Sequence, residues 1–257
     1  MTERHGGNMN SSGQARIDGR PVGLVTGATR GLGRAIAGQL AQTGMTVLVG
    51  ARDVRRGQAV VDELSAAGGD LAVVHLDVTD QQVVDAAVDW VAERFGRLDA
   101  LVNNAGVMTD DDPPDAVSAD VVAEIFATNV IGVVRVTNAF VPLLRRSGAG
   151  RVVNMSSLAG SLSLMSTPGH PSSTVGRLGY SSSKAALNAL TVMYAQALRS
   201  DGVLVNSVCP GFVDTDLNHH KGTRHVDEAA QLPVRLATLG ADGPTGSFVD
   251  STGPVPW

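Results

Sequence analysis

Two side chains that could exchange a proton with a substrate lie four positions apart in the chain, Tyr180 and Lys184. On a helix, residues at this spacing share one face, so the phenol and the ammonium would be neighbours. A nearby cation favours phenolate. The pair therefore predicts a tyrosine pKa below its ordinary value and a tyrosine that gives or takes a proton near neutral pH. The spacing arises often by chance, and a surface tyrosine beside a solvated lysine is the alternative.

Two further polar residues could act with this pair. Ser157 follows an apolar run and could hydrogen-bond a substrate oxygen, although a serine at this place also simply ends a strand. Asn129 lies inside a helical pattern, where asparagine is a poor helix former, and a local kink is the alternative to a functional role. His170 and the pair His219-His220 are expected to lie in surface loops, because a tyrosine–lysine pair needs no histidine.

A glycine-rich segment, residues 26–33, lies between an apolar run at 22–25 and a helical pattern. This order leaves the first N–H groups of the helix unpaired at the positive end of its dipole, where a pyrophosphate could bind. Gly27 would allow the tight turn, Gly31 the approach of the backbone to the phosphates, and Gly33 the packing of helix on strand. An ordinary tight turn is the alternative, but the flanking elements favour a nucleotide site.

Apolar runs alternate with helical patterns along the rest of the chain. The runs are continuous, which predicts a parallel sheet covered by helices on both faces, a doubly wound Rossmann-type α/β fold. In such a sheet ligands bind beyond the carboxyl ends of the strands, so the ends at Gly27, Asn103-Asn104 and Ser157 should cluster. The strands are expected at residues 22–25, 45–49, 71–76, 98–102, 151–155, 203–208 and 247–249.

Residues that favour the start of a helix lie between these apolar runs. We expect helices capped by Asp53 and by a capping box of Thr79 and Gln82. A long helix is expected over residues 118–146, with a break near Asn129, and another over residues 180–200.

Three segments are expected to be loops, and the third of them a lid: residues 107–117, 158–179 and 210–231. The first loop carries three consecutive acids, Asp110 to Asp112. No metal-ligand spacing accompanies them, so we expect a solvated loop and no bound metal.

Length and composition limit the class of protein. The 257 residues are 43% hydrophobic, and no break interrupts the pattern after residue 20, so we expect one domain over residues 21–257 behind a disordered tail at 1–20. The net charge of −5 and the scattered basic residues argue against nucleic acid and anionic membranes as partners. A single cysteine, no secretory signal and no bilayer-long apolar run favour a cytoplasmic protein.

Taken in order, the motifs resemble those of the short-chain dehydrogenase/reductase family over roughly residues 20 to 250, and within it those of the NADPH-dependent carbonyl reductases. Each motif is modest, but the ordered set is specific. The motifs are Thr26–Gly33, Asp77-Val78, Asn103–Gly106, Asn129, Ser157, Tyr180-x-x-x-Lys184 and Pro210-Gly211. Residues 51–58 and 243–249 resemble the carbonyl reductase branch.

The resemblance implies the reduction of a ketone, aldehyde or keto-ester by hydride transfer from NADPH. Tyr180 would give the proton, and Lys184 would lower its pKa and hold the nicotinamide ribose. Ser157 would fix the carbonyl, and Asn129 would support a water that relays protons. The cofactor would contact Gly27, Thr29, Arg30, Gly31, Leu32, Arg52, Asp77, Val78, Asn104, Ala105, Gly106, Tyr180, Lys184, Pro210, Gly211, Val213 and Thr215.

NADP(H) is favoured over NAD(H). No acid occurs from Met45 to Arg52, where an NAD site usually places one, whereas Arg30 and Arg52 could clamp a 2′-phosphate. Asp53, 20 positions after Gly33, points the other way, but we expect it to cap a helix.

The sequence departs from the family in one place. Tyr180 follows Ser157 by 23 positions, more than is usual, although some carbonyl reductases carry insertions here. The added stretch is expected to shape the substrate mouth, and it can obstruct subunit packing, so a monomer, dimer or tetramer all stay open.

An apolar or aromatic small-molecule substrate is favoured by side chains in the loops expected to wall the pocket. They are Leu158, Leu162, Leu164, Met165, Phe212 and Leu217. Two other functions stay open: an alcohol dehydrogenase that works mainly in oxidation, and a catalytically silent NADP(H)-binding regulator.

Overall fold

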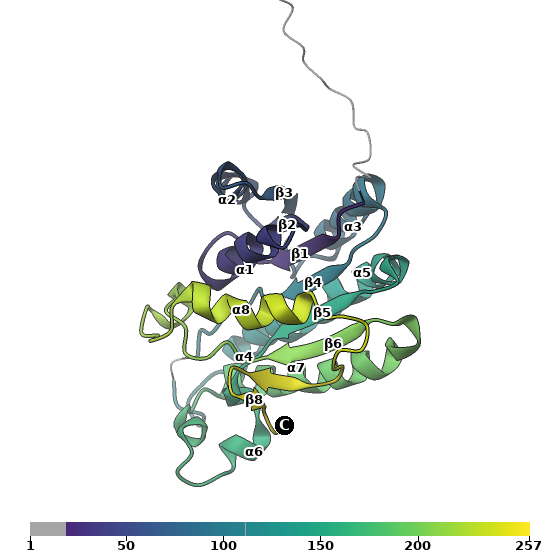
Figure 1. The fold of residues 1–257 in the computed structure, drawn as a ribbon. Helices are drawn as coiled ribbons and strands as arrows, with labels where there is room; N and C mark the ends of the chain where they lie inside the picture. The colour runs from purple at the N-terminus through teal and green to yellow at the C-terminus, as the bar shows by residue number, and fades with distance from the viewer. Residues whose placement is uncertain (1–18, 111) are drawn as a thin grey trace, which may run out of the picture.

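The computed structural model describes residues 19–110 and 112–257, so the expected tail at 1–20 lies almost wholly outside the described residues. The strands are β1 Val22–Thr26, β2 Thr46–Ala51, β3 Asp70–His75, β4 Ala100–Asn103, β5 Arg151–Met155, β6 Leu204–Val208, β7 Phe248–Asp250 and β8 Gly253–Pro254. They form one sheet in the order β3-β2-β1-β4-β5-β6-β7-β8 (Figure 1). The first seven are parallel, which confirms the expected order, and β8 adds an antiparallel edge that was not expected.

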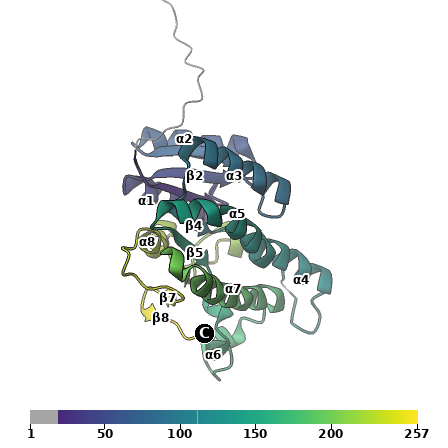
Figure 2. The same cartoon turned by 90° about the vertical axis from the view of Figure 1, so that its right-hand side faces the viewer.

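Helices cover both faces of this sheet. They are α1 Gly31–Gln42, α2 Val54–Ala66, α3 Gln81–Phe95, α4 Ala119–Phe126, α5 Gly132–Ser147, α6 Leu162–Met165, α7 Leu178–Ala197 and α8 Val226–Ala237. Short 3₁₀ turns lie at η2 Leu158–Gly160, η3 Pro171–Thr174, η4 Arg199–Asp201 and η5 Asp216–Asn218. Helices α1, α2 and α8 pack on one face, and α3, α5 and α7 on the other, as the two views show (Figures 1 and 2).

The buried strands contribute side chains to the apolar layers on both faces of the sheet. Neighbouring residues on β1 point to opposite faces: Leu24 joins the α3–α5–α7 layer, and Val25 joins the α1–α2–α8 layer. Leu48 and Val49 on β2 divide in the same way. Because both faces are buried, these strands read as continuous apolar runs in the sequence.

The helix starts confirm one expected cap and correct another. Asp53 caps α2, accepting hydrogen bonds from the backbone N–H groups of Arg55 and Arg56 at 2.9 and 3.2 Å. The capping box expected at Thr79 is wrong, because Asp80 caps α3 with its carboxylate. Thr79 instead donates its hydroxyl to Asp77 at 2.6 Å.

Two of the expected loops contain helix. The segment 158–179 holds η2, α6 and η3. The irregular structure expected as far as residue 231 is wrong from Val226 onward, where α8 begins. Its apolar residues follow helical spacing and are buried, among them Ala230, Leu232 and Leu236, and the helix packs against α1.

The break expected near Asn129 is confirmed as a π-helical turn, η1 Ala127–Ile131, which joins α4 to α5. The wider turn takes up one more residue than an α-helical turn, and such turns are frequent at functional sites. Asn129 is the buried residue of this turn.

A chain of buried polar side chains crosses the middle of the sheet. The Asn103 amide on β4 donates to Thr137 on α5 at 3.1 Å and to Asn154 on β5 at 2.8 Å. Asn154 in turn donates to Thr191 on α7 at 2.8 Å, and Thr191 pairs with Ser207 on β6 at 2.7 Å. Each polar group therefore has a partner in the core, and the chain ties α5 and α7 to the three strands that end at the site described next.

This network predicts the effect of an Asn154→Ala substitution. The variant loses both amide hydrogen bonds and strands buried polar groups, so we expect the free energy of unfolding to fall by roughly 1–3 kcal/mol. Denaturant unfolding measures this. Asn138→Ala, which removes an exposed hydrogen bond to Tyr194, is the control and should cost less. Equal losses of unfolding free energy in the two variants would contradict a special role for this network of buried polar side chains.

Candidate active site

Lys184 joins α7 to the end of β5. Its side chain is buried, and its ammonium nitrogen Nζ donates to the Met155 carbonyl at 2.7 Å. The same nitrogen lies 5.5 Å from the centroid of the Tyr180 ring. The spacing of four residues thus places the Lys184 amine and the Tyr180 phenol on one face of α7, at the carboxyl edge of the sheet.

Ser157 and Tyr180 meet at this edge although 23 positions separate them. Ser157 follows β5 and lies close enough to the Tyr180 phenol to lower its pKa, against the larger effect of burial. The Ser157 hydroxyl oxygen also accepts the backbone N–H of Ala159 at 3.2 Å, which holds the serine at the start of η2. The two hydroxyl groups are therefore neighbours, although they come from different elements.

Asn129 holds the surrounding backbone in place from the π-helical turn. Its carbonyl oxygen accepts the Val107 N–H at 2.8 Å, and its amide donates to the Val107 carbonyl at 2.9 Å and to the Ser183 hydroxyl at 3.1 Å. The side chain thereby joins the loop after β4 to the helix that carries Tyr180 and Lys184.

The pKa values of Tyr180 and Lys184 differ from what the sequence led us to expect. Burial raises the pKa of Tyr180 to about 12, although part of the residue is solvent-accessible. Burial also lowers the pKa of Lys184 to about 8, so the amine gives up its proton before the phenol does. The expectation that the tyrosine pKa lies below its ordinary value is therefore wrong for the protein without a bound cofactor, because desolvation of the phenol outweighs the lowering of its pKa by Ser157 and Arg177.

Two neighbours of the phenol did not stand out in the sequence. Asp110 was expected in a solvated loop, but it is 1% exposed and its carboxylate accepts the Tyr180 backbone N–H at 2.9 Å. Cys209, after β6, is buried and acts on the pKa of both Tyr180 and Lys184. The one signal for Asp110 is its place, four residues beyond the strand-end motif that closes at Gly106.

The glycine turn has the shape that a dinucleotide needs. Gly27 has a φ of +63°, and a Cβ on it would lie 3.0 Å from the Ala105 Cα. A Cβ on Gly33 would lie 2.6 Å from the Gly27 carbonyl oxygen, so only glycine allows α1 this close to the turn. No side chain caps α1, in contrast to α2, α3 and α4, so its first N–H groups are free for an anion. These residues fit the pyrophosphate of NAD(P)(H).

The lid expected after β6 touches this turn. A Cβ on Gly31 would lie 3.4 Å from the Thr215 methyl carbon, and Arg30 forms an ion pair with Asp216 at 2.9 Å. Val213 is buried and Gly211 has a φ of +88°. The predicted residues of the lid and of the glycine turn are thus brought together.

Predicted contacts near the adenine end lie beyond β2 and β3. Asp77 accepts hydrogen bonds from Thr79 through one carboxylate oxygen, and its pKa is lowered because these bonds and Arg52 outweigh the effect of burial. Arg52 is exposed and lies near Asp77, whereas Asp53 is engaged in capping α2. Val78 is buried.

The strand-end motif after β4 holds the glycine turn. The Asn104 amide donates to the carbonyls of Thr26 at 2.9 Å and Gly27 at 3.3 Å, so this side chain is used within the chain. The backbone N–H of Ala105 donates to the Thr26 hydroxyl at 2.9 Å. A Cβ on Gly106 would lie 3.7 Å from the ammonium of Lys184.

The added stretch between Ser157 and Tyr180 is hydrogen-bonded to the residues that follow β8. Ser161 donates its hydroxyl to the Pro256 carbonyl at 2.6 Å, and the Ser163 N–H donates to the Trp257 carbonyl at 2.9 Å. Of the residues expected to wall the pocket, Leu158 and Leu164 pack against Cys209, Phe248 and Val255. Leu162, Phe212 and Leu217 are exposed.

The histidines occupy the loops expected for them. His170 caps η3 by accepting the Ser172 N–H at 3.1 Å. His220 is exposed and lies between Asp214 and Asp216 at 2.7 and 2.9 Å, and these carboxylates raise its pKa. Within residues 19–110 and 112–257, no three His, Cys, Asp or Glu side chains gather as metal ligands would. No helix of the described part combines the length and apolar character needed to cross a bilayer.

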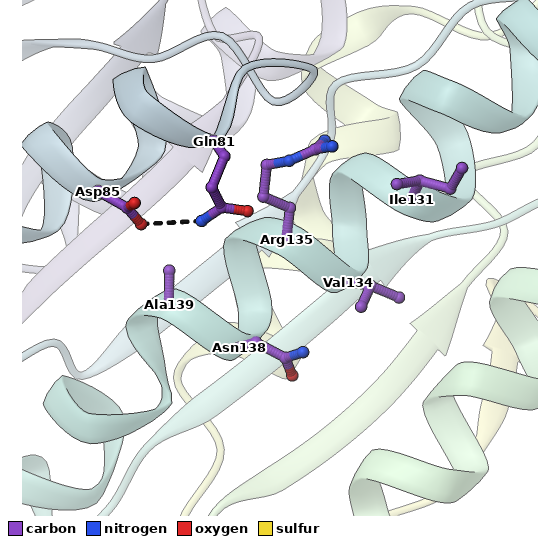
Figure 3. A pocket seen from close by; sticks show the side chains of 7 residues that line it. All are labelled: Gln81, Asp85, Ile131, Val134, Arg135, Asn138 and Ala139. Atoms are coloured by element: carbon purple, nitrogen blue, oxygen red, sulfur yellow. Dashed lines mark hydrogen bonds between the residues drawn. The ribbon is translucent and has the colours of Figure 1, made fainter.

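A separate surface pocket of about 440 Å³ lies between α3 and α5 (Figure 3). The Gln81 and Asp85 side chains on α3 are hydrogen-bonded at 2.8 Å on one side of it, and Ile131 and Asn138 lie on the other. None of the four predicted catalytic residues lines this pocket. The predicted catalytic residues therefore lie apart from this pocket, at the carboxyl edge of the sheet.

The chain belongs to the short-chain dehydrogenase family, whose profile, described as short chain dehydrogenase, matches residues 21–225. The short-chain dehydrogenase anuI of Penicillium roqueforti is 37% identical over 228 residues, covering 86% of this chain and 90% of the relative. NADPH carbonyl reductase 1 of Mus musculus is 32% identical over 283 residues, covering 93% and 99%. The structure of NADPH-bound carbonyl reductase from chicken fatty liver superposes with a TM-score of 0.79 at 29% identity, covering 93% of this chain and 99% of that chain. The resemblance to the carbonyl reductases is confirmed.

The buried amine predicts how stability depends on pH. Below about pH 8, Lys184 is charged in the folded and the unfolded chain, and the folded state bears the full cost of burying that charge. Between about 8 and the unfolded value of 10.5, the folded chain holds the neutral amine and the cost declines. Lys184→Met removes the charge and keeps the length of the side chain.

We therefore expect the free energy of unfolding of Lys184→Met, relative to wild type, to be highest below pH 8 and to fall by roughly 1–3 kcal/mol as the pH rises to 10.5. Urea unfolding across this range measures the difference, with the exposed Lys221→Met as control. A difference that is constant or grows with pH would show that the amine is not held in a desolvated site.

Proposed function

We propose that this protein reduces a ketone, aldehyde or keto-ester to an alcohol with NADPH, with Tyr180 as the proton donor. One observation carries the proposal: the hydroxyl groups of Ser157 and Tyr180 lie together at the carboxyl edge of the sheet, beside the buried Lys184 amine. Two hydroxyl groups converging on one point can bind and protonate a carbonyl oxygen.

The chain's own residues account for the proton and the positioning. Bound NADPH supplies the hydride that reduces the carbonyl carbon. Ser157 donates a hydrogen bond to the carbonyl oxygen, and Tyr180 gives its proton to the same oxygen as negative charge develops there. Lys184, fixed by the Met155 carbonyl, is the nearest amine from which the phenolate can regain a proton. Asn129 keeps this part of the backbone rigid.

The protonation state of Tyr180 suits the proposed reduction. With a pKa of about 12, Tyr180 is a phenol at neutral pH, which is the form that donates a proton to a carbonyl. Oxidation of an alcohol uses the phenolate in the reverse step, so an alcohol dehydrogenase working mainly in oxidation is the alternative that the cofactor ratio decides. The presence of both hydroxyl groups and the amine argues against a catalytically silent regulator.

NADP(H) is the proposed cofactor. Asp53, the acid best placed by sequence to bind the ribose hydroxyls of NAD, is held in its cap of α2 and in an ion pair with Arg56 at 3.5 Å. Arg52 is exposed beyond β2, and Arg30 is exposed in the glycine turn, where it can exchange Asp216 for a phosphate. Two of the relatives above carry NADPH in their own names.

The substrate is proposed to be apolar or aromatic, because the side chains of Leu162, Phe212 and Leu217 are exposed in the segments that follow β5 and β6. We also keep residues 21–257 as one domain in a cytoplasmic enzyme, with its oligomeric state open.

Tyr180→Phe tests the reaction. Without the hydroxyl no proton reaches the carbonyl oxygen, so we expect kcat for aryl ketones and keto-esters to fall at least about 100-fold. NADPH binding, followed by fluorescence, should change little. Tyr194→Phe, which removes the chain's other phenol, is the matched control and should keep full activity. A Tyr180→Phe enzyme that reduces carbonyls at the wild-type rate would refute the proposal.

Arg52→Ala tests the cofactor. If Arg52 binds the 2′-phosphate, its loss should raise the KM for NADPH by about tenfold or more and leave the KM for NADH nearly unchanged. Steady-state kinetics with the two cofactors give both values. Arg55→Ala, on the exposed side of α2, is the control. Equal effects on both cofactors would exclude a phosphate contact at Arg52.

A further inference from the structure

A second cavity lies at the amino edge of the sheet, at the opposite ends of the strands from the proposed active site. Its volume is about 290 Å³, and its lining comes from three segments, within residues 148–151, 199–204 and 241–245. These segments lead into β5, β6 and β7, which are parallel neighbours, so their starts meet at one edge. We call this space the amino-edge cavity. None of the residues predicted to bind cofactor or to act in catalysis lines it.

A buried arginine forms part of the wall of the amino-edge cavity. Arg151, the first residue of β5, is 3% exposed, and main-chain carbonyls hold its guanidinium. Nε donates to the Leu239 carbonyl at 2.8 Å, and Nη1 donates to the carbonyls of Gly150 at 2.9 Å and Gly202 at 3.4 Å. The third nitrogen, Nη2, makes no hydrogen bond to any residue that the structure describes. Two N–H groups of the guanidinium are therefore left for another acceptor.

The charge of Arg151 also lacks a counter-charge. Within residues 19–110 and 112–257, its guanidinium forms no ion pair with a carboxylate. Burial lowers the pKa of this guanidinium, but an arginine side chain stays charged in proteins. Main-chain carbonyls satisfy its hydrogen bonds without cancelling the charge, and buried charges are usually paired. An anion in the cavity would supply both an acceptor for Nη2 and the missing negative charge.

Two exposed charged side chains line the same cavity. They are Arg199, on η4 before β6, and Asp242, in the segment before β7. Neither forms an ion pair within the part of the chain that the structure describes. Arg199 therefore adds a second cation for an anion to meet, and Asp242 opposes the anion. Two arginines and one aspartate give the lining a net charge of +1.

We propose that the amino-edge cavity binds a phosphoryl group, as inorganic phosphate or as the phosphate of a small organic molecule, between Nη2 of Arg151 and the guanidinium of Arg199. A phosphoryl group carries a charge of about −1.5 to −2 at neutral pH and several acceptor oxygens, which suits two guanidinium groups. Bound there, it would hold the starts of three strands together. The inference does not rest on the proposed reductase function, because the cavity and the proposed NADP(H) site share no residue.

Isothermal titration calorimetry of the full chain with phosphate tests this site. NADPH is kept at saturation so that phosphate cannot bind at the cofactor site, and sodium chloride of equal ionic strength is the control for screening. We expect saturable binding of inorganic phosphate and none of chloride. A second titration with glycerol 3-phosphate distinguishes the two sources: tighter binding than that of inorganic phosphate indicates an organic phosphate, and weaker binding indicates the free ion.

The two exposed residues should change the Kd for phosphate in opposite directions. Arg199→Gln removes a cation and should raise the Kd about threefold, whereas Asp242→Asn removes an opposing charge and should lower it about threefold. Arg151→Met removes the buried donor and should raise the Kd about tenfold or more. Arg94→Gln, at an exposed arginine of α3 outside the cavity lining, is the matched control and should bind phosphate as wild type does.

Thermal unfolding gives a second readout, because a ligand that binds the folded state raises the Tm. Phosphate should raise the Tm of wild type more than chloride does, and this difference should vanish in Arg151→Met. If Arg151→Met does not fold, the opposite shifts in Arg199→Gln and Asp242→Asn decide the question. Wild type without saturable phosphate binding, or a Kd that is the same in all variants, would overturn the inference. Neither result affects the proposed reduction, which Tyr180→Phe tests separately.

Discussion

One hydrogen bond, from the Lys184 ammonium to the Met155 carbonyl, determines the geometry of the site. It ties α7, which carries Tyr180, to the end of β5, and Ser157 follows this strand end. A buried ammonium needs a hydrogen-bond acceptor, and the carbonyl at the strand end is a fixed one, so this bond helps to hold the helix in place on the sheet. The polar chain from Asn103 to Ser207 holds the same helix and strands further down the sheet.

Desolvation and charge compete at the phenol, and desolvation prevails in the chain by itself. As a result, the Tyr180 phenol keeps its proton at neutral pH. The Lys184 amine, whose pKa is lowered, is close to half-protonated in mildly alkaline solution. Paired groups whose environments push their pKa values in opposite directions are a common arrangement for acid–base work. Here the same burial that stabilises the fold sets the acidity of the donor.

The sequence was sufficient for the strand order and for the meeting of Ser157 with Tyr180, because continuous apolar runs and the ordered motifs depend on local pattern. It was insufficient where tertiary contacts decide. Helix α8 carries two acids, Asp227 and Glu228, in its first turn, and its apolar residues are buried because it packs against α1. The burial of Asp110 depends on a helix 70 positions away. The pKa of Tyr180 depends on how much water the folded protein excludes from the phenol. The sequence spacing between Tyr180 and Lys184 carries no information about this burial.

The π-helical turn at Ala127–Ile131 has a consequence for the register of the whole α4–α5 rod. Deleting a single amino acid there would let the rod run as uninterrupted α-helix. Because the wider turn takes up the extra residue, the helical faces on its two sides would keep their relative orientation, and the apolar stripe of α5 would keep its place on the sheet. The change would be local to the turn that carries Asn129, whose side chain binds Val107 and Ser183. The extra residue thus adds a polar anchor to the rod without altering the register of its apolar face.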